Sequence, residues 1–252
     1  MSRNFIIGIL LILSITASSP AVAAVTFSES FNGATLDPQL YVTTSSSAYS
    51  LTQLTPGSTW QMSKQAGTTT GAVELHTNFK VSGNFTVDLT LDNTNVGTGD
   101  FGMRIGEDFY NYPIAEMFFT ASQGTNSGTI ADYFSNSGYG AAGFGTTTHT
   151  ATLRIVRTGN QFKYFADGHL SASAVFNNFS GPTPVTIFLR PSSYSPPFSF
   201  DLGQPDAHVG VLDQFTITAD AFVFVPEPTT VTLLTMATVF AGFTTRRMRR
   251  LR

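Results

Sequence analysis

The chain contains no cysteine among its 252 residues, which excludes a disulfide framework, a thiolate metal site and a cysteine nucleophile. Charge is also sparse, because Asp, Glu, Lys and Arg together make up 12% of the sequence. A disordered, charge-rich chain is therefore excluded, and 23 phenylalanines are enough to fill a large apolar core. A core of this kind does not need covalent cross-links.

Basic residues are scarce between Val25 and Val225, where seven Lys and Arg stand against 15 Asp and Glu, a net charge of −8. Such an acidic segment repels phosphate backbones, so no nucleic-acid partner is expected. Five of the 13 basic residues lie instead in the last seven positions. The formal net charge of −3 therefore conceals a strong asymmetry between the body of the chain and its tail.

The N-terminal segment 1–23 has the organisation of a signal peptide. Arg3 supplies a short positive region, Phe5 to Ile15 is apolar, and Ala21-Val22-Ala23 offers the small residues that signal peptidase requires. The apolar stretch of about 11 residues is too short to cross roughly 30 Å of hydrocarbon, which disfavours an uncleaved anchor. We expect cleavage after Ala23 and export through the inner membrane.

The C-terminal segment 226–252 begins with Pro226-Glu227-Pro228, whose prolines remove backbone donors and end the preceding strand. Thr229 to Thr245 then runs for 17 residues without a charge, about 25 Å as a helix and a marginal membrane span. The positive-inside rule keeps the following arginine cluster in the cytoplasm, so the acidic domain must lie on the far side. That cluster comprises Arg246, Arg247, Arg249 and Arg250.

These three parts, in this order, resemble the PEP-CTERM sorting tag of Gram-negative bacteria. The resemblance covers 226–252 and implies recognition by a membrane-embedded, exosortase-type processing protease in organisms that make exopolysaccharide. It also implies delivery to the cell envelope, the cell surface or the extracellular matrix. A plain C-terminal membrane anchor is the alternative interpretation.

Strand signals dominate the segment 25–225, which we treat as one domain. Phe85 to Leu91 alternates apolar and polar residues without a slip, and the same period of two recurs in 101–105, 150–157 and 185–189. Turn residues at 158–160 and 167–168 divide the region after 150 into a three-strand meander. No window combines a 3.6-residue period with good helix formers, so we predict an all-β domain of roughly 11 to 14 strands.

Three features in chain order resemble the concanavalin A-like lectin/glucanase superfamily, which includes laminin-G-like domains. They are an opening strand at Phe27 to Asn32, a hairpin at 153–168 and a closing strand at Val209 to Ile217. The resemblance implies a two-sheet antiparallel jelly-roll sandwich, here placed between an N-terminal signal helix and a C-terminal transmembrane helix. An immunoglobulin-type sandwich or another jelly roll would show much the same alternation.

Familiar catalytic patterns are missing from this domain. Laminarinase-type glycosidases of the superfamily place carboxylates at alternate positions of one strand, Glu-x-Asp-x-Glu, and none of the five Glu here has an acidic partner two residues away. The four His occur singly, without the spacing of a zinc site, and there is no Gly-x-Ser-x-Gly elbow. We therefore assign no catalytic residue and expect no enzyme activity.

The best candidate for a binding site is the segment 107–113, which combines carboxylates, an amide and aromatic rings as sugar sites do. An ordinary strand-connecting loop is the alternative, and Trp60 is either a sugar platform or part of the sandwich core or rim. Calcium could take oxygen ligands from the same segment, and no other cofactor is expected. The residues concerned are Glu107, Asp108, Tyr110, Asn111 and Tyr112.

The sequence thus favours an exported, non-enzymatic protein of the cell surface or extracellular matrix, whose sandwich binds glycan or is purely structural. Two alternatives stay open. One is an enzyme acting on polysaccharide, a glycosidase or lyase, with a carboxylate site that the sequence does not reveal. The other is an adhesive surface protein without a small ligand.

Overall fold

The computed structural model describes residues 23–55, 59–65, 71–95, 99–106, 114–120, 127–134, 138–145, 150–176, 179–191 and 208–224. Within these ranges the chain forms 14 strands and no helix, which confirms the predicted all-β class. In the same ranges there is accordingly no helix of the length and hydropathy that a membrane span needs. The predicted sorting segment 226–252 and nearly all of the signal peptide lie outside the described residues. The strands are β1 (Val25–Glu29), β2 (Leu40–Thr44), β3 (Tyr49–Gln53), β4 (Trp60–Lys64), β5 (Val73–Asn95), β6 (Gly99–Ile105), β7 (Ile114–Thr120), β8 (Ser127–Phe134), β9 (Gly138–Gly145), β10 (Thr150–Thr158), β11 (Gln161–Ala166), β12 (His169–Val175), β13 (Thr183–Pro191) and β14 (His208–Phe224).

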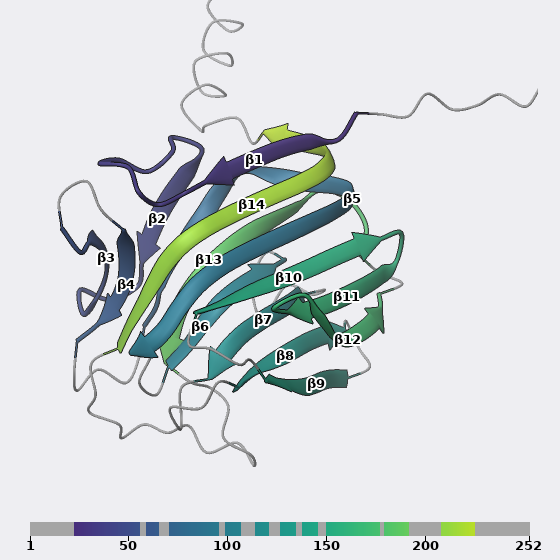
Figure 1. Cartoon of the computed structure of the whole chain (residues 1–252). Coiled ribbons are helices and arrows are strands. Elements are labelled where there is room, and N and C mark those ends of the chain that lie inside the picture. The colour runs from purple at the N-terminus through teal and green to yellow at the C-terminus, as the bar shows by residue number, and fades with distance from the viewer. Residues whose placement is uncertain are drawn as a thin grey trace, which may run out of the picture.

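The strands form one antiparallel sheet that curls back on itself into a sandwich (Figure 1). Its main path runs β12-β11-β10-β5-β13-β6-β7-β8-β9, while β14 pairs with β5, β1 and β4, and β2 pairs with β5. The long strand β5 connects the two layers. Its first half pairs with β2 and β13, and its second half pairs with β10, while β14 accompanies it over most of its length.

The change of layer along β5 coincides with Gly83, which has a φ of +76°. A Cβ there would collide with the side chain of Asp220, whose carboxylate accepts a hydrogen bond of 2.7 Å from the backbone N–H of Asn84. Opposite this point, the register of β14 against β5 shifts between Ala219 and Ala221. A glycine and a bulge bend a strand without breaking its ladder, so the two halves of β5 belong to different layers.

The core lies between the two layers and takes alternate residues from both. The inward positions predicted in 85–91, 101–105 and 185–189 are confirmed, because their apolar side chains are buried in one cluster with those of β10, β11 and β14. Phe162 lies at one end of this cluster, with its ring centroid 4.7 Å from those of Phe176 and Phe179. Each fully buried Leu, Ile or Phe contributes about 1.5 to 3 kcal/mol to folding.

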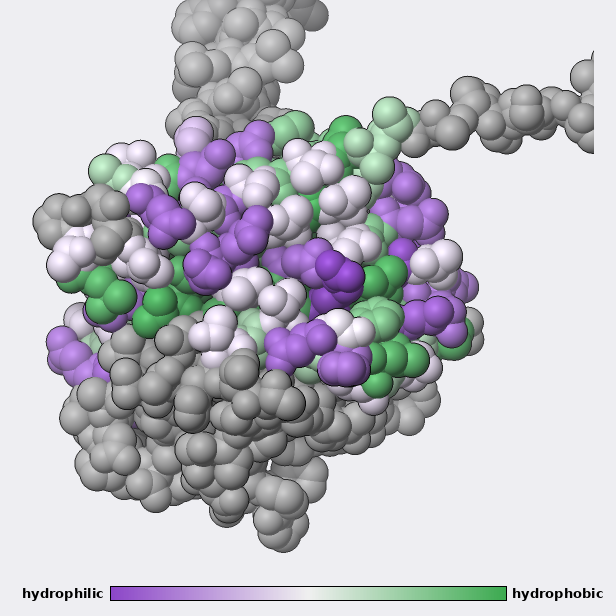
Figure 2. All heavy atoms as spheres, viewed as in Figure 1, coloured by the Kyte–Doolittle hydropathy of each residue, from purple (hydrophilic) through white to green (hydrophobic). Residues whose placement is uncertain are grey.

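The meander predicted after residue 150 is present as β10, β11 and β12. The first turn has Gly159 at a φ of +60°, and the second has Asp167 and Gly168 at +50° and +79°, as tight hairpin turns require. The outward side chains of β10, β5 and β14 are mostly polar, and the hydrophilic colours over these strands in Figure 2 reflect this.

The predicted opening strand is shorter than expected. β1 ends at Glu29 because its carboxylate turns to the following loop and accepts hydrogen bonds of 2.8 Å from the N–H groups of Phe31 and Asp37. Phe31 has a φ of +55° and is fully buried, which takes the chain out of the strand direction. The closing strand is longer than expected, since β14 continues to Phe224.

Candidate functional site

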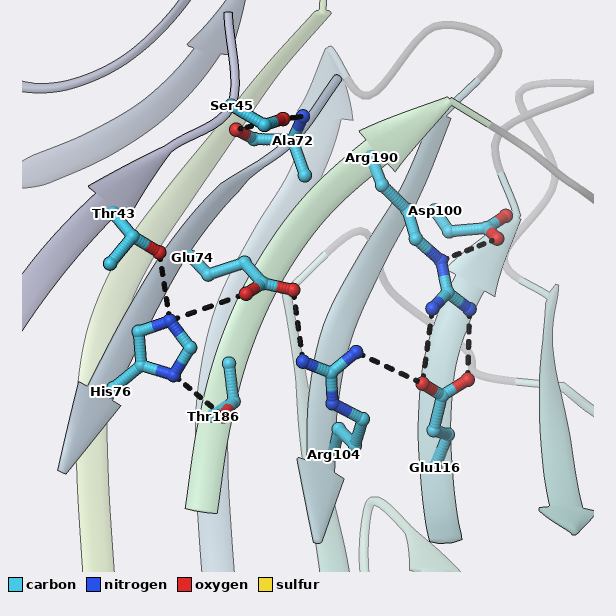
Figure 3. A network of polar contacts seen from close by, with 10 residues as sticks. All are labelled: Thr43, Ser45, Ala72, Glu74, His76, Asp100, Arg104, Glu116, Thr186 and Arg190. Atoms are coloured by element: carbon cyan, nitrogen blue, oxygen red, sulfur yellow. Dashed lines mark hydrogen bonds and ion pairs between the residues drawn. The ribbon is translucent and has the colours of Figure 1, made fainter. Parts of the chain in front are cut away.

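One layer of the sandwich carries a second set of buried and partly buried side chains on the face turned away from the core. Strand alternation creates this face, because the residues between the core positions of β5, β13, β6 and β7 all point to the other side of the sheet. We call this set the polar face. It consists of Glu74 and His76 of β5, Thr186 and Arg190 of β13, Asp100 and Arg104 of β6, and Glu116 of β7 (Figure 3).

At the buried end of the polar face, Arg190 holds two carboxylates. Its terminal nitrogens donate to both carboxylate oxygens of Glu116, at 3.0 and 2.8 Å, and its Nε lies 3.3 Å from Oδ2 of Asp100. Both acidic side chains are completely buried. A bidentate guanidinium pair is among the strongest charge-assisted contacts, so Arg190 stabilises the charges of both carboxylates in a dry environment.

Arg104 connects this buried pair with a third carboxylate. One terminal nitrogen donates to Oε1 of Glu74 at 2.9 Å, and the other lies 3.9 Å from Oε1 of Glu116. The guanidinium of Arg104 therefore lies between the carboxylates of Glu74 and Glu116. The sheet therefore gathers carboxylates that lie far apart in the sequence.

Glu74 and His76 form the more exposed end of the polar face. His76 Nε2 lies 3.2 Å from Oε2 of Glu74 and 2.8 Å from the hydroxyl of Thr43, while Nδ1 contacts the hydroxyl of Thr186 at 3.1 Å. Burial by itself would raise the pKa of Glu74, but the hydrogen bond from His76 and the charge of Arg104 outweigh it and lower this pKa to about 2. Glu74 is therefore ionised throughout the physiological range.

Two phenylalanine rings pack against the guanidinium groups of the arginines. Phe188 of β13 and Phe118 of β7 meet across Gly102 of β6, with ring centroids 6.0 Å apart. The Arg190 guanidinium lies 4.4 Å from the centroid of Phe188 and 5.2 Å from that of Phe118, at cation–π distance. A Cβ on Gly102 would collide with the backbone of Phe118 and the carbonyl oxygen of Met117, so glycine is required for this close packing.

The exposed fraction of the side chains increases across the polar face from β7 toward β2. The side chains of Glu116 and Asp100 are 0% exposed, those of Arg104 and His76 are 7% and 16% exposed, and that of Glu74 is 24% exposed. Solvent can therefore reach the β5 end, where Glu74 lies. Glu116 and Asp100 serve chiefly to hold the arginines.

The structure gives Trp60 a position at the rim of the sandwich. This residue begins β4, packs partly buried against the core, and donates a hydrogen bond of 3.1 Å from its indole N–H to the carbonyl of Gly33. The predicted binding segment 107–113 lies outside the described residues, as does the arginine cluster of the tail. No group of three or more metal-ligating side chains occurs in the part of the chain that the structure describes.

Sequence reasoning missed the polar face for two different reasons. Glu74 and His76 are two residues apart in an alternating strand, so their common side could have been read from the sequence. The proximity of Asp100 and Glu116 could not have been read from the sequence, because it depends on the register of β6 against β7 and β13. A Glu-x-Asp-x-Glu pattern that began at Glu116 would need acidic residues at positions 118 and 120, where the chain has Phe118 and Thr120. The three acids of the polar face therefore come from three strands instead of one.

Comparison with solved structures identifies the class of fold. The chain resembles jelly-roll enzymes at 9 to 12% sequence identity, which establishes a concanavalin A-like fold and supports the predicted sandwich. No family model and no curated protein matches the sequence.

Three of these similar structures illustrate the extent of the match. A β-glucanase from Bacillus licheniformis has a TM-score of 0.56 at 12% identity, over 76% of this chain and 97% of its own. A β-1,3-1,4-glucanase (lichenase) from a mouse hindgut metagenome has a TM-score of 0.58 at 12% identity, over 78% and 99%. A glycoside hydrolase family 16 endo-glucanase from Bacteroides ovatus has a TM-score of 0.57 at 11% identity, over 76% and 99%.

These comparisons contradict the prediction of a non-enzymatic protein with a glycan-binding or structural sandwich. The similar solved structures named above are polysaccharide-cleaving enzymes, and they match over almost their whole length. A search for acidic partners along one strand misses Glu74, Asp100 and Glu116, which the sheet gathers from three strands.

Replacing Arg190 with Met is expected to lower the free energy of unfolding by about 3 to 5 kcal/mol, because Glu116 and Asp100 then lose the charge of Arg190 while they stay buried. Urea unfolding measures this change. The matched control is Arg154→Met, which breaks the more exposed ion pair with Asp88 and should cost at most about 1 kcal/mol. Equal losses in the two variants would contradict the role given to Arg190.

The low pKa of Glu74 predicts that part of the free energy of unfolding depends on pH in the acid range. Since this pKa falls from 4.5 to about 2 on folding, the stabilisation is complete above pH 4.5 and is lost as the pH drops to about 2. In Glu74→Gln this part is absent, so the stability difference between wild type and variant should shrink over that interval. Unfolding curves at several pH values test this, and a constant difference would refute the assignment.

Proposed function

We propose that the protein is a polysaccharide-active enzyme, a glycoside hydrolase of neutral β-linked glucans, with its reaction centre at the exposed end of the polar face. The supporting observation is the combination of a fold similar to β-glucanases with an ionised, solvent-accessible carboxylate, Glu74, on one face of the sheet. The fold similarity alone is compatible with many activities. Glu74 is the group that would take part in the reaction.

Glu74 is suited to act as the nucleophile, because a carboxylate whose pKa is about 2 stays ionised but is a weak base. Glycosidases need one ionised carboxylate beside the sugar, and a pKa of about 2 keeps Glu74 in that form at any working pH. The hydrogen bond from Arg104 and the contact with His76 fix the orientation of its two oxygens. A fixed carboxylate needs little reorganisation when positive charge develops on the sugar ring.

His76 is the positioning partner of Glu74 in this proposal. Its imidazole lies 3.2 Å from Glu74, and its ring is oriented by Thr43 on one side and Thr186 on the other. Because both ring nitrogens have partners, His76 holds Glu74 in place, and the leaving sugar oxygen takes its proton from water. Asp100, Glu116 and the two arginines form the charged support behind this pair.

The experiment is release of reducing sugar from a panel of β-glucans, with Glu74→Gln as the test variant. Removing the carboxylate should reduce kcat/KM by at least about 100-fold without unfolding the protein. Asp88→Asn is the matched control, because this acid lies on the same strand but pairs with Arg154, away from the polar face. Wild-type activity in Glu74→Gln would exclude Glu74, and no activity of the wild type on any polysaccharide would refute the enzyme.

We also propose that the enzyme acts outside the cytoplasm. The supporting features are the signal-peptide pattern at 1–23 and the PEP-CTERM-like segment 226–252, whose expected partners are signal peptidase, an exosortase-type protease and the membrane. A location in the envelope or extracellular matrix would place the enzyme beside exopolysaccharide. No metal or other cofactor enters the proposal.

Deleting 226–252 should move the protein from the envelope fraction to the soluble exported fraction, because the apolar segment and its arginines are lost. Cell fractionation followed by immunoblotting measures the distribution. Mutation of Pro226 and Pro228 to Ala tests whether the tag is recognised by more than its apolar length. An intact full-length chain that is soluble in the cytoplasm would refute this location.

A further inference from the structure

Exposed apolar side chains gather along one edge of β5. Because β13 pairs with the other edge, β2 and the end of β14 must share this one, β2 beside residues 73–77 and β14 beside residues 79–82. The two segments carry four of the eight large apolar residues that are exposed in the described part of the chain. We call this set the apolar edge. It consists of Tyr41 and Val42 of β2 and Val223 and Phe224 of β14, which are 41 to 56% exposed.

The aromatic core reaches the surface at the apolar edge. Phe79 of β5 is completely buried, and its ring centroid lies 4.3 Å from that of Phe222 and 5.9 Å from that of Phe224. On the core side, Phe27 of β1 packs against Phe79 with centroids 5.4 Å apart. Phe224 is therefore held by a packed cluster while half of its surface is open. A side chain held in this way loses little conformational entropy when a partner covers it.

The sequence places the apolar edge close to the segment that is expected to enter the membrane. β14 ends at Phe224, and the uncharged stretch 229–245 begins five positions later. Five extended residues span at most about 18 Å. The headgroup region on each side of the hydrocarbon is about 7 Å thick. When 229–245 crosses the membrane, the apolar edge is therefore held within reach of the headgroup layer.

Charge favours contact through the same edge. The segment from Val25 to Val225 has a net charge of −8, so an anionic membrane repels most of its surface. The apolar edge is itself uncharged, and the residue opposite Val223 on β5 is the cation Lys80. Valine and phenylalanine gain free energy on leaving water, while tyrosine and lysine suit the level of the headgroups.

We propose that the apolar edge lies on the phospholipid surface, with Val223 and Phe224 at the boundary between headgroups and acyl chains and Tyr41 at the level of the headgroups. This inference rests on the proposed location outside the cytoplasm and is independent of the proposed reaction. A sheet that stands on one edge keeps both of its faces in water. The contact therefore holds the domain in a single orientation and leaves the Glu74 end of the polar face open.

The test is fluorescence quenching of the full chain in vesicles of phosphatidylethanolamine and phosphatidylglycerol with brominated acyl chains. Tyr41→Trp reports on the apolar edge from a position far from the tail in sequence, so tethering alone does not bring it to the lipid. Leu170→Trp is the matched control, since Leu170 is 59% exposed on β12, which β11 and β10 separate from β5 (Figure 1). Both variants retain Trp60, whose wild-type signal is subtracted. Quenching in Tyr41→Trp should be at least about threefold stronger.

A second substitution tests whether the apolar side chains cause the contact. Phe224→Ser removes the most exposed ring of the apolar edge, so the quenching in Tyr41→Trp should fall to the level of Leu170→Trp. Leu54→Ser is its control, because Leu54 is 52% exposed after β3 and lies outside the apolar edge. That control should leave the quenching unchanged.

The outcomes separate the contact from the anchor and from the reaction. Equal quenching in Tyr41→Trp and Leu170→Trp, with the chain bound to the vesicles, would overturn the contact and leave the anchor. Quenching that survives Phe224→Ser would overturn the role of the apolar edge, and a chain that does not bind the vesicles would overturn contact and anchor together. A dimer in sedimentation that Phe224→Ser dissociates, without quenching by lipid, would assign the edge to a second copy instead. None of these results depends on activity toward glucan.

Discussion

The structure depends on one strand that belongs to two layers. β5 is 23 residues long, bends at Gly83, and provides the pairing edge for β2 and β13 before the bend and for β10 after it. Because the ladder continues through the bend, the layers are hydrogen-bonded to each other as well as packed face to face. The apolar cluster between them fills the space that this bend defines.

The polar face follows from the same geometry. Alternation gives each strand of the β13 layer a core side and an outer side, so a row of carboxylates and guanidiniums can lie only one residue away from a row of buried aliphatic groups. The arginines stabilise the buried acids, and the acids in turn fix the arginines over Phe118 and Phe188. This rigid support leaves Glu74 and His76 as the accessible groups.

The sequence was informative where local pattern decides the structure. Alternation in Phe85 to Leu91 and the turn residues at Gly159 and Gly168 predicted strands and hairpins that the structure contains. The site was predicted poorly, because the contacts of Arg104 with Glu74 and Glu116 join residues 30 and 12 positions away through strand register. The register is set by strand pairing across the whole sheet, so no short sequence motif predicts it.

The pairing of β1 with β14 has a consequence for how the protein is made. Val25 lies beside Ala219, and Thr26 and Thr218 are separated by 192 positions, so β1 finds its partner only after β14 has been synthesised. Until β14 emerges, β5 also lacks the neighbour that follows it through the bend. The growing chain therefore cannot close this pairing until β14 is available, and its unpaired strand edges need protection from aggregation until then.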